Sequence, residues 1–282
     1  MVKVFPLIFI LLWSSAFITT KPIIDNSDPF AALAFRFSIV ALGFFLFSIY
    51  SKKKILINRK NFIESFFSGV LFHGFYLGGV FFSISKGMPT GIAALIVTLQ
   101  PILTNALSGP ILNEKVTIKQ WIGVLLGFTG AAIVLGLDVG SDIPMMGLVA
   151  TIISLIAITS STIWQKKLSN NLPLSVSNMY QAIGGITFHL LVIIFFAKPY
   201  IDFSQTFIIA MSHQILLVSF GAFTILMYLI KNNSASKTVS IFFLIPATSA
   251  FMAWLFLDES LTNLDLIGFL ITSIGVYIAT RD

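Results

Sequence analysis

The chain has 282 residues, of which 57% are hydrophobic and only 10% carry a charge, with 17 basic side chains against 11 acidic ones. A water-soluble globular protein carries about 25% charged residues, so this composition excludes a soluble domain and indicates a protein that resides in a lipid bilayer. The absence of cysteine excludes a disulfide framework and a thiolate metal site.

Apolar runs long enough to cross a bilayer as helices follow one another along the whole chain. Because these runs are continuously apolar and do not alternate, they predict an all-α integral membrane protein and exclude a membrane β-barrel. Pro29, Pro89 and Pro144 stand where a first helical turn tolerates a missing N–H. We expect ten transmembrane helices, at residues 4–22, 29–50, 62–85, 89–109, 119–137, 144–165, 175–197, 207–230, 237–257 and 262–280.

The loops between these helices differ in charge on the two sides of the membrane. With ten crossings, thirteen lysines and arginines fall on the side of the two chain termini, and only Lys21, Lys86 and Lys198 fall on the other side. Lysine and arginine accumulate in cytoplasmic loops, so we expect both termini in the cytoplasm, with the chain in a bacterial inner (plasma) membrane. The net charge of +6 is a product of this topology and indicates no nucleic-acid partner.

The two halves of the sequence match when one is shifted by 145 residues. The shift aligns Lys86 with Lys231, Pro101 with Pro246, Glu114 with Glu259, Thr117 with Thr262, Gly123 with Gly268 and Gly130 with Gly275. Five crossings are an odd number, so the two copies must lie in the membrane with opposite orientations. We therefore expect an inverted repeat of two five-helix halves, residues 1–140 and 141–282, the architecture of carriers that bind their solute near the midplane.

The matched prolines, Pro101 and Pro246, interrupt the fourth and ninth predicted helices. Each proline removes an i to i−4 hydrogen bond and frees a carbonyl near the middle of the bilayer, which is tolerated only against protein or water. We interpret the pair as hinges. The alternative is a simple packing kink, because prolines are common in membrane helices.

Several segments resemble the EamA-type branch of the drug/metabolite transporter superfamily. They are LLWSSAF in the first helix, SKGMPTGIAALIVTLQPILTNAL across the fourth and NEKVTIKQWIGVLLGFTGAAIVL through the fifth, with SASKTVSIFFLIPATSAFMAWLFLDESLTNLDLIGFLITSIGVYIA in the second half. The resemblance covers essentially the whole chain. It implies a ten-helix carrier of metabolites, often an exporter, that moves amino acids or related solutes. The chain departs from the pattern most in residues 160–164 and at Gln181, which takes the place corresponding to Arg36.

Polar and aromatic side chains at membrane depth are the candidates for contact with a solute, because polar groups there are costly. The candidates are Trp13, Ser14, His73, Tyr76, Gln100 and Thr104. His73 and Tyr76 are one turn apart and so share a helix face, as do Gln100 and Thr104. For His73 the alternative is a hydrogen bond to a neighbouring helix, and for Gln100 it is a bridge between helices.

Three charged residues receive other roles. Arg36 is the one formal charge well inside a predicted span, and we expect it to be a gate or a contact for an anionic group, unless it reaches outward or pairs with Asp25 or Asp28. Glu114 and Glu259 precede the fifth and tenth predicted helices, where a carboxylate stabilises the positive N-terminal end.

The expected function is secondary active transport of small metabolites by alternating access, as an exporter or exchanger. A channel or lipid flippase-like protein is the alternative. The sequence has no H-E-x-x-H, G-x-S-x-G or G-x-x-x-x-G-K motif, and its three histidines lie in separate helices, so we expect no enzyme, metal site or cofactor. The expected partners are the small-molecule solute and the lipid bilayer, with the chain a monomer or homodimer.

Overall fold

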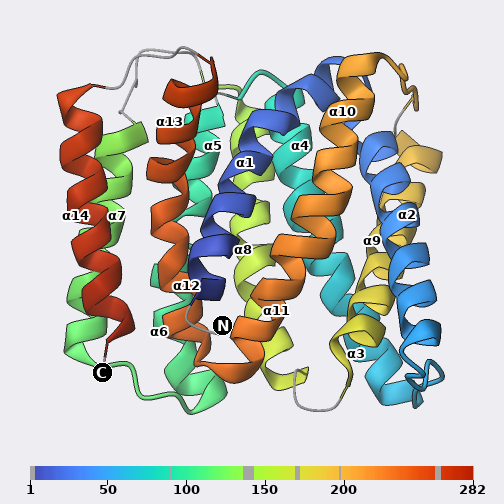
Figure 1. Cartoon of the computed structure of the whole chain (residues 1–282), viewed down its shortest axis with the longest axis horizontal. Coiled ribbons are helices and arrows are strands. Elements are labelled where there is room, and N and C mark those ends of the chain that lie inside the picture. The colour runs from blue at the N-terminus through green and yellow to red at the C-terminus, as the bar shows by residue number, and fades with distance from the viewer. Residues whose placement is uncertain are drawn as a thin grey trace.

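The structure is a computed structural model that describes residues 4–88, 90–135, 143–168, 172–196, 198–257 and 262–281. The described chain is a bundle of helices, and each of the ten predicted spans coincides with one helix or with consecutive helical segments (Figure 1). In chain order the segments are α1 (Phe5–Asp25), α2 (Pro29–Tyr50), α3 (Arg59–Gly69), the π-helical η2 (Val70–Leu77), α4 (Gly78–Ser85), α5 (Thr90–Val97), α6 (Gln100–Leu112), α7 (Ile118–Leu135), α8 (Met145–Leu168), α9 (Leu174–Phe196), α10 (Gln205–His213), the π-helical η3 (Gln214–Ala222), α11 (Phe223–Asn232), α12 (Ala235–Ser240), the 3-10 turn η4 (Ile241–Phe243), α13 (Leu244–Leu257) and α14 (Asn263–Thr280).

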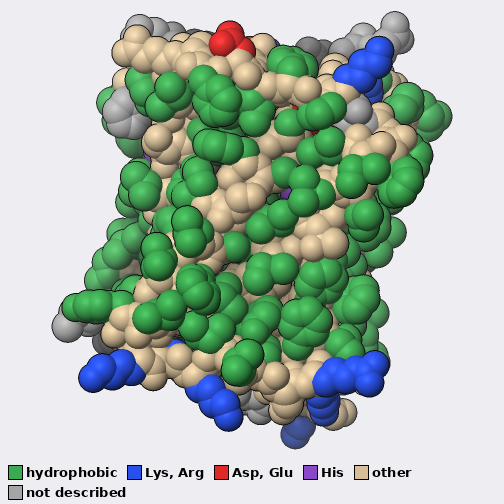
Figure 2. Space-filling view, turned by 90° about the vertical axis from the view of Figure 1, so that its right-hand side faces the viewer, with side chains coloured by type: hydrophobic (Ala, Val, Ile, Leu, Met, Phe, Trp, Pro, Cys, Tyr) green, Lys and Arg blue, Asp and Glu red, His purple; other side chains and the backbone are tan. Residues whose placement is uncertain are grey.

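The surface of the bundle is apolar around its middle. Nine helical stretches of the described chain are long and apolar enough to cross a membrane, and Ile118–Val134 adds a shorter apolar helix. Figure 2 shows hydrophobic side chains over the middle of one face and Lys and Arg side chains along its lower edge. These observations agree with the all-helical membrane protein expected from the sequence. The end at which α1 begins and α14 ends is called the terminal end below, and the opposite end the distal end.

Two helices begin with the same capping arrangement. Before α14, the backbone N–H of Asp265 donates to Thr262 Oγ1 at 3.2 Å and the N–H of Thr262 donates to Asp265 Oδ2 at 2.7 Å. Before α7, Gln120 and Thr117 make the equivalent bonds at 3.2 and 2.8 Å. Each pair satisfies N–H groups that the first helical turn leaves unpaired. The two pairs are 145 residues apart, as are the repeats in the sequence.

A change of helix geometry precedes each of the two matched prolines. α5 ends at Val97, and the N–H of Leu99 donates to the carbonyl of Ile96 at 3.1 Å, a tight i to i−3 bond, before α6 continues through Pro101. In the second half, the 3-10 turn η4 precedes α13 and Pro246. A proline inside a helix has no N–H to donate and its ring clashes with the preceding turn. The predicted breaks are therefore present in both halves.

Two helix pairs form opposite edges of the bundle. Figure 1 shows α7 beside α14 at one edge and α2 beside α9 at the other. Glycine permits the close approach of α7 and α14. A Cβ on Gly123 would lie 2.6 Å from the carbonyl oxygen of Gly275, and a Cβ on Gly275 would lie 2.7 Å from that of Gly123. A side chain at either position must therefore separate the two backbones.

We expect Gly275→Leu to lower the free energy of unfolding by roughly 1–3 kcal/mol, the usual cost of inserting atoms into a filled space. The matched control is Gly109→Leu, because a Cβ on Gly109 meets no atom closer than 3.8 Å among its described neighbours. Equilibrium unfolding in mixed micelles measures the free energy of unfolding of the two variants. Equal losses in the two variants would contradict close packing of α7 on α14.

The described interior contains two buried apolar clusters. One includes Trp13 and Tyr76, and the other includes Phe81. Leu77, at the end of η2, packs against both. The candidate site lies where the two clusters meet, since these four residues line it together.

Candidate functional site

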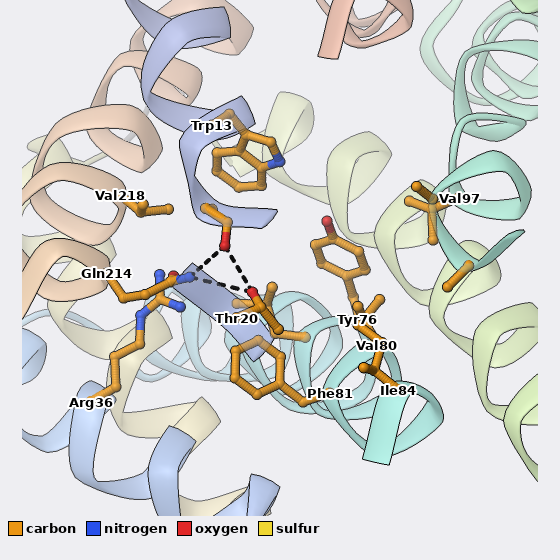
Figure 3. A pocket seen from close by; sticks show the side chains of 14 residues that line it. Trp13, Thr20, Arg36, Tyr76, Val80, Phe81, Ile84, Val97, Gln214 and Val218 are labelled. Carbon is orange, nitrogen blue, oxygen red and sulfur yellow. Dashed lines mark hydrogen bonds between the residues drawn. The ribbon is translucent and has the colours of Figure 1, made fainter. Parts of the chain in front are cut away.

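A pocket lies in the distal half of the bundle, between α1, α2, η2, α4, α5 and η3 (Figure 3). Its cavity volume is about 50 Å³. Most of its lining is apolar, and the polar and aromatic groups come from Trp13, Thr20, Arg36, Tyr76 and Gln214. A largely apolar cavity with a few converging polar groups is typical of a site for a small molecule.

Arg36 is buried in the wall of this pocket. The residue is 3% exposed, and its Nε donates to Ser219 Oγ on η3 at 2.8 Å. The guanidinium carbon lies 5.3 Å from the centroid of the Phe37 ring. Among the described residues, no carboxylate lies within salt-bridge distance of Arg36. The pocket thus holds a buried positive charge that no described acidic side chain neutralises.

The acidic residues that the sequence offers as partners for Arg36 are engaged elsewhere. Asp25 pairs with Lys21 at 3.0 Å. Asp28 caps α2, accepting hydrogen bonds at 3.0 and 2.9 Å from two N–H groups of its first turn. Arg36 therefore neither pairs with these acids nor extends its side chain to the membrane surface. Burial of a charge without an anionic partner is costly, and an anionic ligand in the pocket would offset that cost.

Gln214 fixes the wall next to Arg36. Its Nε2 donates to the carbonyl of Ala16 at 2.9 Å and to Thr20 Oγ1 at 3.4 Å (Figure 3), and also to Thr19 Oγ1 at 2.9 Å. These bonds join η3 to α1 across the two halves of the chain. Gln214 and Thr20 are not among the site residues predicted from the sequence. The available signal was a glutamine well inside the apolar run 207–230, a position as costly as that of Gln100.

Trp13 and Tyr76 line the pocket, and Figure 3 shows Tyr76 across the cavity from Arg36. Their rings are held by Phe72, whose centroid lies 6.1 Å from that of Trp13 and 5.2 Å from that of Tyr76, both in edge-on arrangements. Aromatic faces in such positions attract cations and pack against apolar groups. The pocket thus offers a positive charge at Arg36 and aromatic faces at Trp13 and Tyr76.

His73 does not line the pocket, although the sequence predicts that it shares a face with Tyr76. Its ring packs between Phe37 and Phe223, with centroids at 4.3 and 4.7 Å, and its carbonyl accepts from His189 Nε2 at 3.0 Å. The difference follows from η2, because a π-helix closes i to i+5 hydrogen bonds and a turn holds more residues than in an α-helix. Residues three apart therefore point in more divergent directions than the α-helical spacing predicts.

Three further candidates are buried outside the pocket. Ser14 donates to the carbonyl of Ile245 at 3.2 Å, directly before Pro246. Gln100 donates from Nε2 to Thr162 Oγ1 on α8 at 2.9 Å. This bond is the bridge between helices expected from the sequence as the alternative role of Gln100. Gln100 Oε1 and Thr104 Oγ1 have no hydrogen-bond partner among the described residues.

α6 carries a row of buried polar side chains toward the terminal end. Gln100, Thr104 and Ser108 are four residues apart, and each keeps an oxygen without a partner in the described part of the chain. Asn105 lies beside this row and accepts a hydrogen bond from Ser236 Oγ on α12. Unpartnered polar atoms are rare inside proteins, so the row is a second candidate surface for polar groups.

Glu114 caps a helix, but a different one from the helix that the sequence predicts. Its carboxylate accepts from the N–H of Ala235 at 2.9 Å and from the N–H of Ser236 at 3.4 Å, at the N-terminus of α12. The predicted location was the start of α7, where Thr117 and Gln120 already satisfy the first turn. Glu114 therefore joins the two halves of the chain at the terminal end. Glu259, the other predicted cap, lies outside the described residues.

We expect Glu114→Ala to lower the free energy of unfolding by about 1 kcal/mol, the usual cost of losing a side-chain cap. The loss leaves two N–H groups of α12 without their acceptor. The matched control is Glu64→Ala on α3, which removes a carboxylate for which no contact with a helix N-terminus is described. Thermal melting in detergent compares the two, and equal shifts in melting temperature would contradict the role of Glu114 as a cap.

Comparisons with known proteins agree with a membrane transporter. The sequence matches the EamA-like transporter family twice, over residues 4–136 and 145–281. It is 27% identical over 195 residues to the uncharacterised transporter YvbV of Bacillus subtilis. This alignment covers 65% of this chain and 61% of YvbV, so the chain spans less than two thirds of that relative. It is 24% identical over 294 residues to a probable amino-acid metabolite efflux pump of Escherichia coli, covering 98% of this chain and 93% of the pump. A solved crystal structure with 16% sequence identity has the same fold, with a TM-score of 0.84 over 99% of this chain and 96% of that one.

Proposed function

The chain belongs to the EamA-like transporter family, and from this premise we propose that it is a secondary active carrier, an exporter or exchanger, of small carboxylate-bearing metabolites such as amino acids. The observation that carries the proposal is Arg36, buried in the pocket without a described anionic partner. A guanidinium binds a carboxylate through two parallel hydrogen bonds and is the usual residue for this task. The name of the Escherichia coli relative agrees with such a solute.

An amino acid matches both ends of the pocket. Its carboxylate would lie at Arg36, and its ammonium or apolar part would lie against the rings of Trp13 and Tyr76. Cation contacts with aromatic faces favour the ammonium group, and the apolar lining favours an apolar side chain.

The proposal includes two five-helix units, residues 1–140 and 141–282, that are inverted relative to each other. Support comes from the two family matches and from the capping pairs before α7 and α14. The helix breaks before Pro101 and Pro246 and the π-helical segments η2 and η3 recur at the same spacing. Inverted repeats of this kind allow one structure to open toward either side of the membrane.

Alternating access would use the contacts at the terminal end as a gate. There, Glu114 binds the N-terminus of α12, and Asn105 accepts from Ser236. Bending at Pro101 and Pro246 would separate these groups and bring the polar row of α6 into contact with the solute. The distal pocket would close in the same movement.

The terminal end is proposed to face the cytoplasm of a bacterium. Lys and Arg side chains line this edge of the molecule in Figure 2, and basic residues accumulate on the cytoplasmic side of membrane proteins. Single cysteines introduced into the loops test this topology, because the natural chain contains no cysteine.

Purified protein in proteoliposomes tests the function. We expect saturable uptake of radiolabelled amino acids, and faster uptake when the vesicles are preloaded with the same unlabelled amino acid. The corresponding amino-acid amides, which lack the carboxylate, should compete poorly. Flux that rises linearly with concentration and shows no counterflow would indicate a channel instead, and absence of flux for the whole amino-acid panel would overturn the proposal.

A further inference from the structure

A second, smaller pocket lies at the terminal end, between α8, α9 and α11. Its cavity volume is about 20 Å³. The polar residues in its wall are Gln165, Ser177, Asn178 and Gln181, and the rest of its lining is apolar. No ionisable side chain is among the described residues that line it.

The wall of this pocket contains buried polar atoms without partners. Asn178 is 1% exposed, and neither its Nδ2 nor its Oδ1 has a hydrogen-bond partner among the described residues. Gln165 is 2% exposed, and its Oε1 also lacks a partner there. A buried amide that gains no hydrogen bond loses its hydration without compensation, so such groups normally mark a binding site or an ordered water.

The neighbouring side chains fix the direction in which the amide of Gln165 points. Gln165 Nε2 donates to Gln181 Oε1 at 2.9 Å and to Ser161 Oγ at 3.1 Å. Gln181 Nε2 in turn donates to Ser177 Oγ at 3.2 Å. The remaining groups are the two oxygens of Gln165 and Asn178, which accept hydrogen bonds, and the Asn178 nitrogen, which donates them.

The 145-residue shift relates this pocket to the one that contains Arg36. Gln165 corresponds to Thr20, and Gln181 corresponds to Arg36, and both of these first-half residues line the distal pocket. The enclosing helices α8, α9 and α11 likewise correspond to α1, α2 and α4. The small pocket is thus the counterpart of the distal pocket at the other end of the molecule, with a neutral amide in place of the guanidinium.

We propose that this pocket is a second solute subsite, which takes a small uncharged group with both a hydrogen-bond donor and an acceptor, such as a carboxamide or hydroxyl. The subsite rests on the proposed carrier function, since it would hold the polar side chain of a solute near the cytoplasmic gate. Without a charge in its wall, it does not compete with Arg36 for a carboxylate. Asn178 supplies the central donor and acceptor, and Gln165 supplies a further acceptor.

A single introduced thiol tests the subsite in the full-length protein, which otherwise contains no cysteine. Leu174→Cys places the thiol in the pocket wall and leaves the polar residues unchanged. We expect the membrane-impermeant thiosulfonate MTSET to label it from the side of the chain termini, and we expect acetamide and L-glutamine to slow the labelling. Adding Asn178→Leu should abolish this protection and keep the labelling rate in the absence of both compounds, since leucine is the residue at the equivalent position, Leu33.

Val80→Cys, in the wall of the distal pocket, is the matched control. We expect MTSET to label it from the opposite side at a rate that Asn178→Leu does not change, which also shows that the Asn178 variant is folded. If Asn178→Leu does not fold, Asn178→Ala replaces it in the same comparison.

Any of three results would overturn the subsite. MTSET labels Leu174→Cys only from the distal side, neither compound slows the labelling, or the protection persists after Asn178→Leu. The last of these results would indicate that Asn178 holds only an ordered water. Saturable amino-acid flux without protection would reject the subsite alone. Protection that depends on Asn178 without any flux would reject the carrier function and keep the binding site.

Discussion

Arg36→Gln is expected to weaken amino-acid transport by the reconstituted protein strongly, because it replaces the guanidinium with a neutral amide, the group found at Gln181 in the second half. Loss of one partner from a buried, hydrogen-bonded charge pair costs about 2–5 kcal/mol. Since about 1.4 kcal/mol corresponds to a factor of ten, the half-saturation concentration should rise at least roughly thirtyfold. Initial uptake rates over a range of amino-acid concentrations measure the change.

Two further measurements separate recognition of the carboxylate from a structural role for Arg36. The wild-type protein should melt at a higher temperature when an amino acid is present and show no such shift with the corresponding amide, because only a ligand that binds the native state stabilises it. The Arg36→Gln variant should fold at least as stably as the wild type, since it removes an uncompensated buried charge, but it should lose the amino-acid shift. Unchanged transport and an unchanged shift in this variant would exclude a carboxylate site at Arg36. Arg59→Gln at the exposed start of α3 is the control.

Alanine in place of both matched prolines is expected to slow exchange by roughly tenfold, the effect of about 1.4 kcal/mol on the barrier. Alanine restores the N–H that Pro101 and Pro246 lack, so α5 and α6 can continue as one straight helix, and so can η4 and α13. The exchange rate at saturating amino acid inside and outside the vesicles measures this step. Thermal stability should change little, because both prolines stand in the first turn of their helices, where a missing N–H is tolerated.

Pro110→Ala is the matched control, because Pro110 lies in the same helix α6 but Leu255 stands at the equivalent position in the second half. We expect this variant to exchange amino acids at the wild-type rate. Unchanged exchange in both Pro101→Ala and Pro246→Ala would leave only a packing kink at these sites.

The sequence predicted the spans and the positions of the helix breaks well, for a simple physical reason. A lipid bilayer requires about twenty apolar residues per helix, and this requirement is visible in composition alone. Arg36 was visible for the same reason, because a charge inside an apolar run stands out. Trp13 and Tyr76 were also placed at the right depth and line the pocket with Arg36.

The arrangement of side chains between helices was less predictable. Glu114 is adjacent in sequence to the start of α7 but binds α12, about 120 residues away, and no local pattern encodes that contact. Gln214 was overlooked because it lacks a charge, although its amide joins η3 to α1. His73 was expected in the site because it is polar at mid-membrane depth and lies one α-helical turn from Tyr76, but the backbone there forms a π-helix. Local spacing predicts faces only when the helix type is known.

η2 also makes the third span tolerant of a change in length. A π-turn holds about one residue more than an α-turn, so this stretch accommodates a surplus residue while the helix that follows keeps its direction. Deleting one residue from Val70–Leu77 would allow the stretch to close into ordinary α-turns, and Val80, Phe81 and Ile84 would stay in the pocket wall. The change would instead fall on the residues of the wide turn itself, His73 among them.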